Sequence, residues 1–149
     1  MSGTIKAVFF DMYNTLARFD PPREELQQRV CKEFGIEVSK RGILQGYVAA
    51  DDYMAQEHGR NPLTKRSREE QRQFFSEYQR LVLQGADTDV SRELAGEIFG
   101  AIRKIPYDLA LFDDAIPCLE EVKERGVKVG MITHIYRDIG EVCDRLGLS

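Results

Sequence analysis

Residues 8–16 read VFFDMYNTL, an apolar run that ends abruptly at Asp11 and continues into a polar turn through Asn14 and Thr15. The run completes a stretch from residue 4 that is rich in bulky and β-branched side chains, which predicts a strand buried on both faces of a parallel sheet. In such sheets, ligands bind beyond the carboxyl ends of the strands. Asp11 is therefore either a nucleophile at the mouth of the sheet or a capping aspartate in an Asx-turn.

A second strand of the same buried type is predicted at residues 127–133, VKVGMIT, and it also ends in polar side chains, Thr133 and His134. Before it, the segment DDAIP at residues 113–117 opens a helix that Gly126 closes, and a last helix follows the strand. The chain therefore contains two α/β pieces whose strands end in the same way.

Helices with apolar stripes, and no strand pattern, are predicted between the two α/β pieces. Three of their starts are marked by residues that cap or open helices, namely Pro21, Ser39, and Thr88 or Asp89, and the remaining stretch runs from Thr64 to Leu83. The last of these helices extends to Ile105, where Pro106 breaks it. We therefore predict an α/β core of residues 1–17 and 107–149, with an all-α insertion of residues 18–106.

Composition narrows the class of protein. The chain is 42% hydrophobic and 31% charged, as is ordinary for a soluble globular domain, and it has no apolar run of about 18 residues that would predict a membrane span. A net charge of −4 argues against nucleic acid or an anionic membrane as a partner. The three cysteines, Cys31, Cys118 and Cys143, are far apart and odd in number, which indicates free thiols in a reducing cytoplasm.

Residues 10–16, FDMYNTL, resemble the first motif of the haloacid dehalogenase (HAD) superfamily, in which a strand is followed by Asp-x-Asp/Tyr-x-Thr-Leu. Residues 111–119 and the strand after them resemble the lead-in to the second motif of that superfamily. The helical insertion resembles the all-α cap of its subfamily I members. The resemblance covers the chain in order and implies a hydrolase with a Rossmann-like α/β parallel-sheet core and an inserted all-α cap.

The resemblance also implies roles for individual residues. Asp11 is expected to attack the substrate and become a transient aspartyl ester, and Thr15 to orient the site through its hydroxyl. Thr133 matches the residue that hydrogen-bonds the substrate oxygen or the transferred group. Phosphatases of the family bind Mg²⁺ through the residue at Asp11 and the backbone carbonyl of the residue at Tyr13.

Tyr13 departs from the phosphatase pattern, because phosphatases carry a second aspartate there as general acid/base. A phenol with a pKa of about 10 is a poor substitute for a carboxylate at neutral pH. Tyrosine at this position resembles the 2-haloacid dehalogenases, in which halide leaves without a proton and no metal is used. We therefore expect no cofactor if the chain is dehalogenase-like and Mg²⁺ if it is phosphatase-like. Asn14, where glycine is common, tolerates the same turn conformation.

Other substrate contacts are expected from His134 and the cap. His134 stands where asparagine is common, and it is a hydrogen-bond donor, a titrating base or a solvated loop residue. Arg41 and Tyr47 have the spacing with which similar dehalogenases hold a substrate carboxylate, although an exposed helix arginine is the alternative. Arg18, just after the nucleophile loop, is a second cationic candidate.

The family's lysine and later acidic loop have no counterpart before Ser149. We therefore expect the N-terminal portion only of the core. Three hypotheses follow: a dehalogenase-like hydrolase of small organic acids, a Mg²⁺-dependent phosphatase-type hydrolase, and a non-catalytic domain. The last would self-associate, as a homodimer, through the open edge of the first strand.

Overall fold

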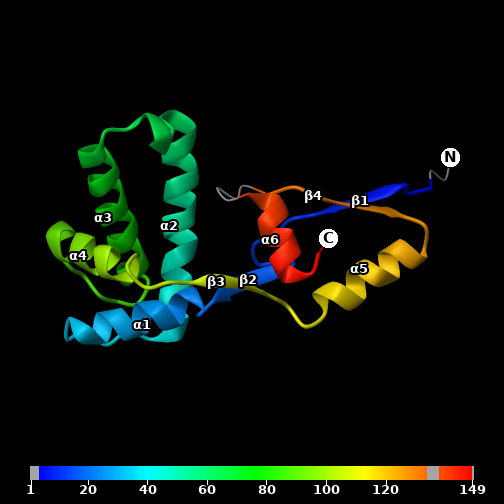
Figure 1. Cartoon of the computed structure of the whole chain (residues 1–149). Helices are drawn as coiled ribbons and strands as arrows, with labels where there is room; N and C mark the ends of the chain where they lie inside the picture. Colours follow the sequence, from blue (N-terminus) through cyan, green and yellow to red (C-terminus); the bar gives the residue numbers. More distant parts are fainter. Residues whose placement is uncertain (1–3, 134–137, 149) are drawn as a thin grey trace. The chain divides into compact units, whose positions relative to one another are not determined.

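The computed structural model describes residues 4–133 and 138–148, which form two compact units (Figure 1). An α/β unit comprises Met1–Pro21 and Tyr107–Ser149, and a helical unit comprises Pro22–Pro106. The elements in chain order are β1 (Ala7–Phe10), β2 (Ala17–Asp20), α1 (Arg23–Glu33), α2 (Lys40–Arg60), the 3₁₀ helix η1 (Leu63–Lys65), α3 (Arg68–Gln84), α4 (Arg92–Ile102), β3 (Asp108–Leu111), α5 (Ala115–Glu124), β4 (Lys128–Met131) and α6 (Ile139–Leu146).

β1 and β4 form a parallel pair, with Ala7 opposite Lys128 and Phe10 opposite Met131. Helix α5 precedes β4 and packs against it, so this part of the chain is the crossover that a parallel pair requires. The parallel pair and its helices confirm the predicted α/β class.

The prediction that both strands are buried on two faces is wrong for the described residues. Side chains of a strand alternate between faces. One face, which carries Phe10 and Val129, packs on Leu16, Ala115 and Leu119. On the other face Phe9 and Ile132 remain 63% and 67% exposed, because the packing that buries the first face does not extend to the second.

β2 and β3 form an antiparallel pair that the sequence did not reveal, with Ala17 opposite Leu111 and Asp20 opposite Asp108. The pairing joins the segment before the helical unit to the segment after it. The two ends of the insertion are therefore held side by side. We predicted that the insertion begins at residue 18, whereas the structure counts Ala17–Asp20 as a strand of the α/β unit and begins the helical unit at Pro22.

Helix starts in the helical unit follow from capping. Ser39 caps α2 as predicted, since its Oγ accepts a hydrogen bond from the Gly42 N–H at 3.0 Å. Residues Leu63–Lys65 form η1, and α3 begins only after Ser67, which makes a capping box with Glu70. The predicted cap of the fourth helix, Thr88 or Asp89, is wrong, because Ser91 caps α4.

Ser91, and not Thr88, caps α4 because Thr88 takes part in the end of α3. Its N–H donates to the Leu83 carbonyl at 3.1 Å, after Asp87 takes a left-handed conformation with φ of 55°. Thr88 therefore completes the end of α3 rather than the start of α4.

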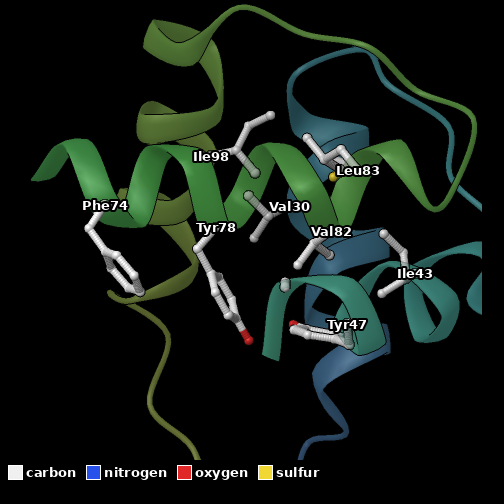
Figure 2. Packing of buried hydrophobic residues seen from close by; sticks show 10 residues of the cluster. Val30, Ile43, Tyr47, Phe74, Tyr78, Val82, Leu83 and Ile98 are labelled. Carbon is white, nitrogen blue, oxygen red and sulfur yellow. The ribbon is translucent and has the colours of Figure 1, made fainter. Parts of the chain in front are cut away.

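The helical unit has its own core of buried side chains from all four helices (Figure 2). Its labelled members are Val30, Ile43, Tyr47, Phe74, Tyr78, Val82, Leu83 and Ile98. Helices α2 and α3 approach closely at Gly46, where a Cβ would stand 2.0 Å from the Val82 carbonyl oxygen. The core also buries Gln27 and Gln79, whose amides exchange hydrogen bonds of 3.0 and 2.7 Å, so both polar groups are satisfied. Within the described residues, no helix is long and apolar enough to cross a membrane.

Candidate active site

The segment after β1 is a tight loop closed by its own backbone. The Asn14 N–H donates to the Ala17 carbonyl at 2.8 Å, and the Leu16 and Ala17 N–H groups donate to the Met12 carbonyl at 3.1 and 2.9 Å. Asn14 has a φ of 56°, the left-handed conformation that asparagine adopts more readily than most residues. The fully buried Met12 side chain anchors the loop. The loop thereby presents Asp11, Asn14 and Thr15 to solvent.

The Asp11 side chain does not act as a cap. In the described part of the chain, its carboxylate takes part in no hydrogen bond or ion pair. Asp138 shows what a capping aspartate does here, because its Oδ1 accepts the N–H groups of Gly140 and Glu141 at 2.8 and 3.2 Å. The geometry therefore gives no support to the Asx-turn alternative and leaves Asp11 exposed at the end of its strand.

The parallel register brings the end of β4 to the same edge. The Ile132 N–H donates to the Phe10 carbonyl at 3.0 Å, so the ladder continues one residue beyond the strand. Thr133 therefore follows at the carboxyl edge of the pair, next to the loop that begins at Asp11. Its Oγ1 is buried and has no hydrogen-bond partner within the described residues.

Tyr13 is fixed by packing rather than left in solvent. It is half-buried, and its ring stacks on Phe19 with centroids 5.2 Å apart and ring planes 18° apart. Its backbone forms a parallel bridge with Ala17. The residue at the position of the phosphatases' second carboxylate is thus an ordered aromatic side chain.

Arg41 and Tyr47, the predicted substrate contacts of the insertion, belong to the helical unit. Arg41 lies in the first turn of α2 and is exposed. Tyr47 is 7% exposed, accepts a hydrogen bond from Gln27 Nε2 at 3.0 Å and has the Arg23 guanidinium 4.0 Å from its ring centroid. Burial raises the pKa of Tyr47. Tyr47 is therefore a core residue and not an exposed partner of Arg41, since six residues on a helix turn the side chain to another face.

Arg18 and His134 are the other two residues that the sequence predicted for the site. Arg18 lies on β2, and its guanidinium stands 6.0 Å from the centroid of the Phe112 ring. His134 lies outside the described residues. Two grooves of the helical unit, one of about 800 Å³ between α3 and α4, are lined by none of the predicted site residues.

The donors for Mg²⁺ are incomplete in the part of the chain that the structure describes. The expected ligands are the Asp11 carboxylate and the backbone carbonyl of Tyr13. Mg²⁺ needs about six oxygen ligands in octahedral geometry, of which carboxylates are the charged members. No group of three or more His, Cys, Asp or Glu side chains gathers among the described residues. These residues do not by themselves fit a magnesium centre.

Phe19, on whose ring Tyr13 stacks, is not among the site residues that the sequence predicted. The signal was present in the alternation Ala17-Arg18-Phe19-Asp20, which is typical of a half-buried strand. The stretch is only four residues long and is followed by two prolines that predict a helix start, so residues from 18 onward were assigned to the helical insertion.

Comparison with known proteins agrees with this geometry. The family model of the haloacid dehalogenase-like hydrolases matches residues 5–149. No curated protein matches the chain. An exposed aspartate at the end of β1, a threonine at the end of the parallel neighbour and a family match over nearly all of the sequence lead to one conclusion: the chain belongs to the haloacid dehalogenase-like hydrolases.

Proposed function

We propose that this hydrolase acts through an aspartyl ester on Asp11 and that its substrate is a small 2-haloacid. The observation that carries the choice of substrate is the stacked ring of Tyr13, which occupies the position of the phosphatases' acid/base carboxylate. Halide leaves with its bonding electrons and needs no proton, so a reaction that expels halide does not require that carboxylate.

The chemistry has two balanced steps. An Asp11 carboxylate oxygen attacks the halogen-bearing carbon, a carbon–oxygen bond forms, and the carbon–halogen bond breaks to release halide. Water then adds to the Asp11 ester carbonyl, the acyl–oxygen bond breaks, and a 2-hydroxy acid leaves as one proton passes to solvent. This step restores the Asp11 carboxylate.

The remaining residues hold the substrate in this proposal. The buried Thr133 Oγ1, which has no described partner, donates to a substrate carboxylate oxygen. Thr15 and Asn14, exposed on the same loop, orient the site, and Tyr13 contacts the substrate beside the reacting carbon. His134, which follows Thr133 in the sequence, supplies the additional donor that a carboxylate substrate needs.

The decisive experiment is a single turnover of L-2-chloropropionate in water enriched with oxygen-18, using the full-length protein in excess over substrate. An ester on Asp11 transfers an ordinary oxygen from Asp11 to the product. Mass spectrometry of the digested protein then finds oxygen-18 in the peptide that contains Asp11. If oxygen-18 appears in the lactate of the first turnover instead, water attacked the substrate directly and the proposal is wrong.

Substitution of the nucleophile gives an independent check. We expect Asp11→Asn to lower the rate of halide release at least about a thousandfold, as loss of a covalent nucleophile does in other hydrolases. The matched control is Asp89→Asn, which removes an exposed carboxylate of the helical unit and should leave the rate unchanged. Full activity in Asp11→Asn would contradict the mechanism.

A phosphatase-type reaction with Mg²⁺ is the second candidate. Its support is the Asp11 carboxylate alone, which is exposed and has no partner among the described residues, because carboxylate oxygens are preferred Mg²⁺ ligands. Phosphate release from a panel of phosphoesters that stops on addition of EDTA would identify this activity. A dehalogenase should be indifferent to the chelator.

A non-catalytic, self-associating domain is the third candidate, favoured by the exposure of Phe9 and Ile132 on the β1–β4 pair. It predicts a dimer in light scattering with no turnover of either substrate class. A monomer that turns over substrate contradicts it.

A further inference from the structure

Three aromatic rings form a row within the α/β unit, which we call the aromatic row: Tyr13, Phe19 and Tyr107. The Tyr13 and Phe19 rings stack with centroids 5.2 Å apart and planes 18° apart. Phe19 then meets the Tyr107 ring edge-on, with centroids 5.4 Å apart and planes 72° apart. Both arrangements are those that aromatic pairs prefer.

The local backbone explains why the first two rings meet. The parallel bridge sets Tyr13 beside Ala17, so their side chains lie on the same side. Phe19 is two residues further along β2 and shares the face of Ala17. Because Ala17 has only a methyl group, the Tyr13 ring has room to extend along the strand to Phe19. A larger side chain at residue 17 would occupy that space.

Phe19 is in turn fixed by the β2–β3 pair. Leu109 is its cross-strand partner, and Tyr107 stands two residues before Leu109, in the diagonal position. Tyr13 and Phe19 both pack against the buried cluster of Met12, Ala17, Leu109 and Val142. The aromatic row therefore connects the loop that follows β1 to β2 and β3, the two strands that flank the helical unit in the sequence.

We propose that Phe19 is a positioning residue for substrate binding, which orients the Tyr13 ring at the site and is itself braced by Tyr107. The proposal rests on the proposed function, in which Tyr13 contacts the substrate. A tyrosine on a short loop would otherwise lose rotamer freedom on each binding event, and that loss weakens affinity. Stacking on Phe19 orders the ring beforehand, so Phe19 acts on binding through Tyr13 and never touches the reacting atoms.

The geometry is tested first by NMR, without any activity assay. With tyrosine rings labelled in carbon-13, the Tyr13 signal is identified among those of the six tyrosines by its loss in Tyr13→Phe. Ring current from a stacked Phe19 shifts the Tyr13 ring protons upfield. We expect Phe19→Leu to abolish this shift and Phe19→Tyr to retain it. A Tyr13 signal that is the same in wild type and Phe19→Leu would overturn the proposal.

Kinetics then test the role. We expect Phe19→Leu to raise the KM for L-2-chloropropionate about 2- to 10-fold, the range of one aromatic pair, with little change in kcat. Phe19→Tyr should rescue KM. The double variant Tyr13→Leu/Phe19→Leu should have the same KM as Tyr13→Leu alone, because Phe19 no longer has a Tyr13 ring to orient.

The control is Phe99→Leu, which breaks another stacked pair, Phe75 with Phe99 at 4.6 Å, in the helical unit. It should lower Tm without the KM effect. If Phe19→Leu lowers Tm and kcat together while KM stays constant, Phe19 is merely structural and the proposal fails. If wild type releases no halide, the proposed function fails instead, and the NMR result still decides whether the stack exists.

Discussion

Thr133 combines two properties that conflict in a purely structural residue. Its Oγ1 is buried, yet none of the described residues hydrogen-bonds it. A buried hydroxyl without a partner costs about 1–3 kcal/mol of folding free energy. Such a cost is expected where the partner is a substrate that binds only during catalysis.

Thr133→Val should therefore separate stability from activity. The methyl that replaces the hydroxyl needs no partner, so we expect Tm to stay equal or to rise. The kcat/KM for halide release should fall about tenfold or more, because one hydrogen bond to a charged substrate group is lost. Thermal melting and steady-state kinetics measure the two effects. A variant that loses stability and keeps activity would show that Thr133 serves the fold alone.

For single residues, the sequence was most informative where the residue type is compatible with few local structures. The position of Asp11 at the end of a strand was predicted from an apolar run that ends on a carboxylate, and β1, which ends at Phe10, confirms that position. Asn14 was expected in a turn and indeed has a φ of 56°. The stacking of Tyr13 on Phe19 was not recognisable, because ring contacts depend on how the loop closes and not on spacing along the chain.

Among the elements, α3 and α4 are joined by one carboxylate. Glu77 on α3 accepts hydrogen bonds from Arg80 at 2.6 and 3.1 Å and from Arg92 on α4 at 2.9 Å. These bonds, that from Arg80 above all, hold the pKa of Glu77 below its ordinary value of 4.5. The folded state therefore favours the deprotonated form more strongly than the unfolded chain does.

The sign of this shift fixes a pH dependence. The stabilisation from Glu77 is present above pH 4.5 and is lost as pH falls through the lowered pKa. Glu77→Gln should cost about 1 kcal/mol of unfolding free energy at pH 7 and flatten the loss of stability below pH 4.5. Urea unfolding at several pH values measures both. Glu97→Gln, an exposed residue of α4, is the control, and an equal effect there would refute the specific role of Glu77.

Elements with local signals were predicted well and elements without them were not. The start of α2 at Ser39 needs only a side chain that accepts its own helix's N–H groups. β2 and β3 are four residues each, and they pair with each other although the whole helical unit separates them in the sequence. No local pattern specifies such a partner, so both strands were missed.

For the molecule as a whole, the helical unit has the properties of an inserted domain. It is one continuous segment, Pro22–Pro106, with its own buried core. Its ends are held together by the cross-strand pair of Asp20 and Asp108. A continuous segment with its own core and adjacent ends meets the usual conditions for independent folding.

We therefore expect residues 22–106, expressed alone, to be helical by circular dichroism and to unfold in one cooperative transition in urea. Within that segment Ile98→Ala should cost about 2–5 kcal/mol, because Ile98 is fully buried. Val48→Ala, at a position 72% exposed, should cost less than about 0.5 kcal/mol. A segment that is unfolded alone would show that its core depends on the α/β unit.

The sequence by itself determined the α/β class, the helical insertion and the strand end that carries Asp11, because periodicity and residue type act over a few neighbouring residues. Tertiary structure alone decided the β2–β3 pair, the one-sided burial of β1 and the stack of Tyr13 on Phe19. Each of these depends on a contact between segments that are far apart in sequence or on the closure of a loop. Such contacts are selected by packing and hydrogen bonding in the folded chain, and no local pattern encodes them.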